Sequence, residues 1–227
     1  ILLKESLESC GISLVAINTE SYKTLPKDLC SIAVEQNIDH VFWNNEFGFN
    51  EMIRDQNSIE FLEENNIRSS SFHDQVIYPP GFLKTGQGNP FSVFTPYKRR
   101  WVENFDMNFL DIVEISKPKR PSSIQSDLSA LKFVKTHSAN IDLWPAGENA
   151  AQEKLENFLQ SKANFYSESR NSPIVDGTSR LSPYLALGIL SPKRCILEGL
   201  KLNDYEFTSG NKGICKWMDE IVWREFY

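Results

Sequence analysis

Two hydroxyl groups, a guanidinium group and the start of a helix lie close together in one segment, Gly177-Thr178-Ser179-Arg180-Leu181-Ser182-Pro183. Ser182-Pro183 is typical of an N-cap followed by the first helical residue, where unpaired N–H groups attract anions. Because hydroxyl and arginine donors favour the same ligands, the segment predicts a phosphate or pyrophosphate site. A capped helix that carries a surface arginine is the simpler interpretation of the composition alone.

A second set of chemical groups shares one face of a helix expected over residues 212–227. At about 100° per residue, this face carries two indoles, a phenol, a carboxylate and a guanidinium, from Trp217, Glu220, Trp223, Arg224 and Tyr227. Ile214, Met218 and Ile221 occupy the adjacent face and should meet the core. The polar, aromatic face suits a planar ligand that needs hydrogen bonds, such as a nucleobase or a flavin. A partly buried helix whose tryptophans only pack explains the pattern equally well.

Other candidate groups are weaker. Asn44–Glu51 follows an expected strand and precedes an expected helix, which is where open α/β sheets bind ligands, although Asn50 as a helix cap is the simpler interpretation. Lys98-Arg99-Arg100 is expected to be a solvated helix face. The three histidines lack the spacing of a metal site, so no metal is predicted.

Helix and strand signals alternate over residues 1–74. Apolar residues at helical spacing predict three helices, at 2–10, 26–37 and 50–65. Short apolar runs predict three strands, at 12–17, 40–43 and 70–73. Such alternation indicates a doubly wound α/β domain with a parallel sheet. Because a helix opens the chain, an earlier strand is expected to be missing.

The remainder of the chain has a different pattern. Residues 75–147 are rich in Pro, Gly, Ser and Lys and contain one short expected helix, at 95–105, so they are predicted to be a long inter-domain connection. Residues 148–227 are predicted to be the start of an all-helical domain, with helix starts at Ser182-Pro183 and Ser191-Pro192.

Composition restricts the class of protein. Of the 227 residues, 41% are hydrophobic and 24% are charged, the balance of a globular protein, and no apolar run reaches the length of a membrane span. The net charge of -6 hides a division, because residues 1–66 hold 12 acidic and 4 basic residues, which leaves 18 acidic and 20 basic residues in the rest. A polyanion is therefore expected to bind the later part. Four widely spaced cysteines favour a reducing cytoplasm over disulfides.

These residues together resemble the DNA photolyase/cryptochrome family, and within it most closely the class I cyclobutane pyrimidine dimer photolyases of bacterial type. Five motifs in the family's order carry the resemblance: Tyr78-Pro79-Pro80-Gly81, Phe94-Thr95-Pro96-Tyr97, Asp176-Gly177-Thr178-Ser179-Arg180-Leu181-Ser182, Leu190-Ser191-Pro192 and Glu220-Ile221-Val222-Trp223-Arg224-Glu225-Phe226-Tyr227. The resemblance implies an antenna-binding α/β domain over 1–74, a connection over 75–147 and part of a helical FAD- and DNA-binding domain over 148–227.

The resemblance also implies an activity, which is light-driven repair of pyrimidine dimers by electron transfer from reduced FAD to a lesion flipped out of the duplex. It implies contacts to FAD from Tyr166, Thr178, Ser179, Arg180, Leu181, Ser182, Trp217 and Arg224. It implies DNA contacts from Arg170, Glu220, Trp223, Arg224 and Tyr227, with Glu220 and Trp223 as the catalytic residues that hold the dimer. Asn50 and Glu51 match positions that hold an antenna, for which we expect methenyltetrahydrofolate in preference to a deazaflavin.

Three alternatives stay open at this point. A cryptochrome-type photoreceptor has the same fold and flavin, a (6-4) photoproduct photolyase repairs a different lesion, and a non-catalytic nucleotide-binding module accounts only for residues 1–74. The resemblance implies a monomeric cytoplasmic protein whose partner is damaged DNA and not a membrane. The missing initiator Met and a helical pattern that runs to Tyr227 indicate a fragment, which is expected to be inactive in repair by itself.

Overall fold

The computed structural model describes residues 1–113, 116–134 and 142–227. The chain forms two compact units, which we call unit 1 (Ile1–Asp74 and Glu114–Asn140) and unit 2 (Gln75–Val113 and Ile141–Tyr227). Residues 75–147, expected to be one connection between domains, therefore divide between the two units. The reason is that Tyr78, Trp101 and Leu110 are buried in the core of unit 2.

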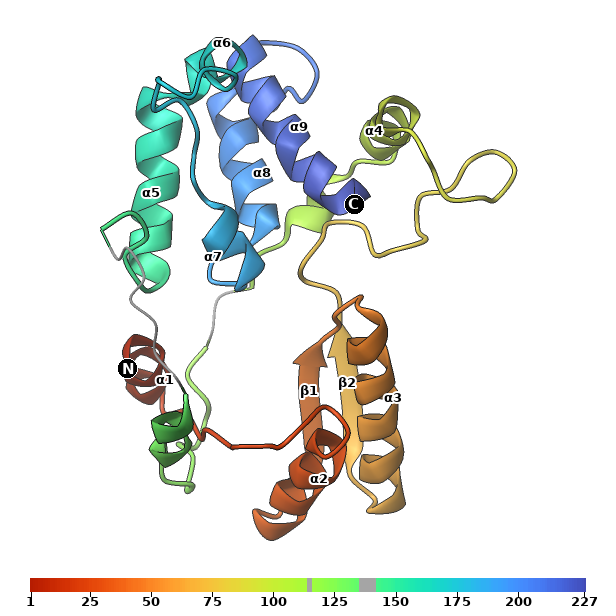
Figure 1. Ribbon diagram of the computed structural model, residues 1–227, viewed down its shortest axis with the longest axis vertical. Helices are drawn as coiled ribbons and strands as arrows, with labels where there is room; N and C mark the ends of the chain where they lie inside the picture. Colours follow the sequence, from red (N-terminus) through yellow and green to blue (C-terminus); the bar gives the residue numbers. More distant parts are fainter. Residues whose placement is uncertain (114–115, 135–141) are drawn as a thin grey trace. The chain divides into compact units, whose positions relative to one another are not determined.

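Unit 1 contains a pair of parallel strands and two helices that pack together (Figure 1). Its elements are α1 (Leu2–Ser9), α2 (Leu25–Glu35), β1 (His40–Asn44), α3 (Phe49–Glu64), β2 (Arg68–Phe72) and the 3-10 turn η2 (Ser129–Phe133). In β1, Val41 and Trp43 pack against the core whereas Phe42 is exposed, as the two-residue period of a strand requires. The predicted α/β class and the parallel pairing are thus confirmed.

The prediction of a strand over residues 12–17 is wrong. Val15 forms only an isolated parallel bridge with Asp127, supported by hydrogen bonds from Ala16 N to Asp127 O (2.7 Å) and from Asp127 N to Leu14 O (3.0 Å). Val15 and Ile17 remain exposed. The apolar run therefore pairs with a distant irregular segment and does not join the β1–β2 sheet.

Unit 2 is helical in the part of the chain that the structure describes. Its elements are α4 (Phe94–Glu103), η1 (Met107–Leu110), α5 (Glu148–Ser161), η3 (Ala163–Phe165), α6 (Tyr166–Ser169), α7 (Ser182–Ala186), α8 (Pro192–Leu202) and α9 (Lys212–Phe226). Ser191 caps α8 as predicted, because its hydroxyl accepts from Lys193 N at 3.2 Å. The Ser182 cap is wrong by one position, since Leu181 is the N-cap residue and α7 starts at Ser182.

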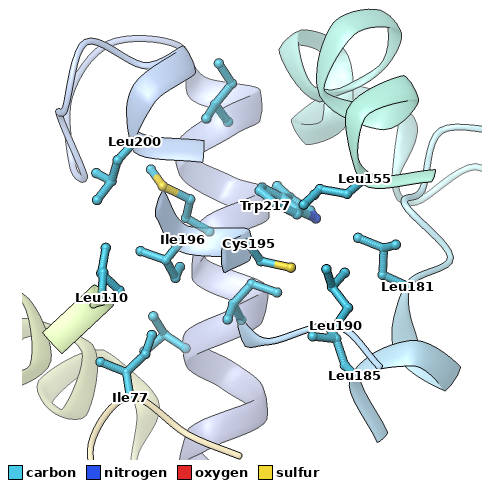
Figure 2. Close-up of a cluster of buried hydrophobic side chains, with 14 of the residues drawn as sticks. Ile77, Leu110, Leu155, Leu181, Leu185, Leu190, Cys195, Ile196, Leu200 and Trp217 are labelled. Carbon is cyan, nitrogen blue, oxygen red and sulfur yellow. The ribbon is translucent and has the colours of Figure 1, made fainter. Parts of the chain in front are cut away.

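The core of unit 2 is built around α9. Ile214, Met218 and Ile221 are buried, as the spacing predicts. Figure 2 shows Cys195 and Ile196 of α8 beside this helix and Leu155 of α5 near Trp217. The helices approach closely at Gly199, where an added Cβ would lie 3.0 Å from the Met218 side chain. None of the helices among the described residues is both long and apolar enough to cross a membrane.

Candidate functional site

The carboxylate of Glu220 lies between two basic side chains, one on α9 and one just after α6. Arg170, which directly follows α6, forms an ion pair with Glu220, and Lys216 approaches the same carboxylate at 3.5 Å. The Arg170 guanidinium also lies over the Tyr166 ring, 5.4 Å from its centroid. The ion pair holds both side chains in position. Because Glu220 and Arg170 both remain partly exposed, they are also accessible to a ligand.

Aromatic rings surround Trp223, one turn further along α9. The ring of Phe94 stacks on the indole with centroids 3.7 Å apart and planes inclined by 12°. Tyr227 stacks less closely, at 5.5 Å and 23°, and is 93% exposed. Phe226 meets the indole at its edge. The C-terminal end of α9 is therefore an aromatic surface, here called the Trp223 face and made of Phe94, Trp223, Phe226 and Tyr227.

Trp217 and Arg224 do not share that surface. Trp217 is only 2% exposed, and its ring lies 5.1 Å from that of Phe158 in the core. The Arg224 guanidinium donates to the backbone carbonyls of Gln75 and Leu185. The five residues expected on one face of α9 therefore do not form one surface, because other segments cover the helix at Trp217 and Arg224. Glu220, Trp223 and Tyr227 remain as the surface groups.

Glu225 is a half-buried acceptor that the spacing did not single out. One carboxylate oxygen accepts from Tyr78 N (3.0 Å), Trp101 Nε1 (2.9 Å) and the Tyr97 hydroxyl (3.3 Å), and the other accepts from Ile77 N (2.8 Å). Burial raises the pKa of Glu225, while these hydrogen bonds oppose that shift. The carboxylate joins the end of α9 to α4 and to the 77–78 backbone.

A partly buried ion pair adds a second link between α4 and α9. Lys98 Nζ lies 2.6 Å from Asp219 Oδ1 and 2.8 Å from Oδ2. The expectation that Lys98-Arg99-Arg100 is a solvated face is therefore wrong at Lys98. Its side chain turns inward because Asp219, on the neighbouring helix, is buried and needs a cation.

The loop over residues 176–182 lines a cavity of about 300 Å³. Besides Thr178, Ser179 and Arg180, the lining includes Lys154 and Lys162 of the adjoining segment. Lys162 and Arg180 both pair with Asp176, at 2.7 and 3.0 Å, and the hydrogen bond from Lys162 lowers the pKa of that carboxyl. The cavity thus combines hydroxyls and three cations, which are donors suited to phosphate oxygens, with the carboxylates of Asp142, Glu153 and Asp176.

The backbone of this loop has an unusual shape. Arg180 has a φ of +52°, and its carbonyl accepts from Trp144 Nε1 at 3.0 Å. A Cβ at Gly177 would lie within 2.4 Å of the Ser169 side chain, so only glycine fits against that residue. Leu181 is buried at 2% exposure, so any ligand contact from Leu181 must come from its backbone.

The two antenna candidates lie in the first turn of α3. Gly48 is the N-cap residue of that helix, so Asn50 is not its cap. Asn50 is exposed and Glu51 is half-buried. Near the carboxyl ends of β1 and β2, Asn45 Nδ2 lies 3.5 Å from His73 Nε2. These groups lie where parallel sheets bind ligands, and the structure shows none of them buried as part of a closed pocket.

Comparison with known proteins identifies the family. The sequence profile described as DNA photolyase matches residues 2–121, which is more than half of the chain. The chain belongs to the DNA photolyase family. It is 32% identical over 225 residues to the deoxyribodipyrimidine photo-lyase of Escherichia coli, covering 99% of this chain and 47% of that protein. The chain spans about half the length of the curated photolyases that it matches.

Solved photolyase structures share the fold. A bacterial class III photolyase from Agrobacterium tumefaciens is 28% identical with a TM-score of 0.78, covering 99% of this chain and 46% of that one. A cryptochrome from Synechocystis is 21% identical with a TM-score of 0.74, covering 99% of this chain and 47% of that one, which shows similarity of fold alone. In this photolyase-family chain, sequence reasoning missed Phe94, Lys98 and Glu225. Two of them lie in recognised motifs, but no local pattern indicates what they contact.

Proposed function

We propose that the protein encoded by the complete reading frame containing this chain repairs cyclobutane pyrimidine dimers in DNA in a light-driven reaction. The observation that carries this proposal is the pairing on α9 of a held carboxylate, Glu220, with an aromatic surface, the Trp223 face. Membership of the DNA photolyase family supports it, as do relatives named deoxyribodipyrimidine photo-lyase.

The side chains on α9 have complementary tasks in this proposal. Trp223 supplies a flat apolar surface on which the flipped-out pyrimidine dimer stacks. Glu220 accepts hydrogen bonds from the polar edges of those bases, and the ion pair with Arg170 holds its carboxylate in position. Flipping a dimer out of the duplex is favoured because its pairing is already weakened. In this proposal Arg170 and the exposed Tyr227 also contact the DNA backbone.

FAD is the proposed cofactor, and the donor set of the 176–182 loop fits its phosphates. Thr178, Ser179 and Arg180, which line the cavity, would hold the pyrophosphate. Leu181, through its backbone, and Ser182 are assigned to the same site from the resemblance, although neither lines the cavity. Tyr166 and Trp217 lie in the core beside this region, and Arg224 fixes the adjoining backbone. When bound and reduced, FAD supplies the electron that opens the cyclobutane ring after light is absorbed.

The remaining assignments concern the antenna and the state of the protein. We assign an antenna site to Asn50 and Glu51 at the start of α3, with methenyltetrahydrofolate as its ligand. We further assign the protein to the cytoplasm, as a monomer that binds damaged DNA.

A repair assay tests the proposed function. The complete protein is incubated with a thymine-dimer oligonucleotide in light and in darkness, and the loss of dimers is measured. We expect repair only in light, and a fall of about 10- to 100-fold in Glu220→Gln, because a hydrogen bond to a charged group is lost. Glu198→Gln is the matched control, since Glu198 forms ion pairs with Arg194 and Lys201 of its own helix, α8. Bound flavin without repair would contradict the proposal and favour the signalling class.

A further inference from the structure

The stack between Phe94 and Trp223 joins two segments far apart in the sequence. Phe94 is the first residue of α4, and Trp223 lies in the last turn of α9. The two ring planes are nearly parallel at a centroid distance of 3.7 Å, so the phenyl ring covers one side of the indole. Both residues are half-buried, which leaves the Trp223 face partly open to solvent.

The position of Phe94 is fixed by the rest of α4. Phe94, Tyr97, Lys98 and Trp101 stand at spacings of three, four and seven residues and so share one side of the helix. Tyr97 and Trp101 donate to Glu225, and Lys98 pairs with Asp219. Because Trp101 is fully buried, α4 is anchored at its far end as well.

The partner residues on α9 also share one side. Asp219, Trp223 and Phe226 are spaced by four and three residues, and Phe226 contacts both Phe94 and Tyr97, at 5.8 and 5.2 Å between ring centroids. The contact between Phe94 and Trp223 therefore belongs to a continuous seam between α4 and α9. An isolated surface indole would instead be free to change rotamer.

We propose that Phe94 is a positioning residue for lesion recognition. By stacking on the indole of Trp223, Phe94 holds that ring in the orientation needed to receive the pyrimidine dimer. The inference rests on the proposed function, in which Trp223 contacts the lesion. A ring that is already immobilised loses less conformational freedom when the dimer binds, so affinity rises without a direct contact from Phe94 to DNA.

Dark binding to two duplexes, one with a thymine dimer and one undamaged, tests this inference in the complete protein. We expect Phe94→Leu to weaken binding of the dimer duplex by about 2- to 10-fold and to leave binding of undamaged DNA unchanged. Phe94→Tyr keeps the stacked ring and should bind like the wild type. Phe82→Leu is the matched control, because Phe82 stacks on Tyr78 (5.1 Å, 6°) in the same unit and makes no ring contact with Trp223.

The same measurement in a Trp223→Leu background separates positioning from a general structural role. If Phe94 acts through the indole, Phe94→Leu has no further effect once Trp223 is replaced. An equal loss in that background, or an equal loss for undamaged DNA, would overturn the inference. So would unchanged dimer binding by Phe94→Leu. A wild-type protein with no preference for the dimer would instead contradict the proposed function itself.

Discussion

The two units of the chain bury their apolar side chains to different extents. The described core of unit 1 consists of Cys30, Ala33, Leu62 and Ile67, with a few partly buried neighbours. The core of unit 2 extends from α4 through α5, α7 and α8 to α9. Since stability grows with buried apolar area, unit 2 should be the more stable of the two.

The polar groups of the two units differ in the same direction. In unit 2, Glu225 and Asp219 are held by donors from α4, and Glu220 is held by Arg170. In unit 1, the ion pairs are mainly local, such as Arg54 with Glu46 and Asp55. A large core with supporting hydrogen bonds holds polar side chains in fixed orientations. The proposed catalytic roles are therefore assigned to residues of unit 2.

The largest effect is expected from Trp101→Ala. Trp101 is fully buried and donates to Glu225, so its loss leaves a cavity and should lower the stability of unit 2 by about 3–5 kcal/mol. Hydrogen exchange that reports on α9 and α3 separately provides the measurement. Amides of α9 should lose protection while those of α3 keep theirs. Equal losses in both helices would show that the units do not unfold separately.

Leu62→Ala is the reciprocal change in unit 1. Leu62 is fully buried between α2 and the strands, and its truncation should lower the stability of that unit by about 2–5 kcal/mol. Because the described core of unit 1 is small, the same hydrogen-exchange experiment should show opening of both α2 and α3. Persistent protection of these helices would indicate that the core is more extensive than the described residues suggest.

A smaller effect is expected from Glu225→Leu. Removing the acceptor leaves buried donors from Ile77, Tyr78 and Trp101 unpaired, which should lower stability by about 1–3 kcal/mol. Urea unfolding measures the change, with Glu198→Leu as the control for a surface glutamate. A similar loss in both variants would argue against a special role for the Glu225 network.

The pH dependence of that variant follows from the raised pKa of Glu225. Between the ordinary pKa of a glutamate and the raised value, the folded state binds more protons than the unfolded state. The free energy of unfolding contributed by Glu225 is therefore fully present at acidic pH and falls as the pH rises through the raised pKa. The stability difference between wild type and Glu225→Leu should shrink from acidic toward neutral pH, and an increase would contradict this sign.

Local features of the fold were predictable from the sequence. The helices at 26–37, 50–65 and 212–227 were expected within one or two residues, because apolar spacing and caps are local signals. The prediction of a strand at 12–17 was wrong, because an apolar run does not reveal whether a neighbouring strand pairs with it. Residues 75–113, part of the segment 75–147 expected to be a connection, belong to unit 2, and the sequence pattern did not indicate this because their partners on α8 and α9 are distant in sequence.

The candidate site was predictable only in part. Glu220 and Trp223 were found from helical spacing and from the resemblance, and both lie on the partly exposed side of α9. The same spacing placed Trp217 with them, although it packs on Phe158 in the core. Glu225 accepts from Tyr78, which is 147 residues away, and no periodicity can report such a contact. Tertiary packing decides which side of a helix a ligand can reach.

The most direct test of the account compares an indole in each unit. Affinities for a dimer-containing duplex and an undamaged duplex are measured in darkness for the complete protein, Trp223→Leu and Trp43→Leu. Trp43 is the matched control because it lies on β1 in unit 1. We predict that Trp223→Leu loses about 5- to 150-fold in dimer affinity, the value of one stacked base, and that Trp43→Leu keeps the wild-type preference. Full dimer preference in Trp223→Leu, or its loss in Trp43→Leu, would contradict the assignment of lesion recognition to α9.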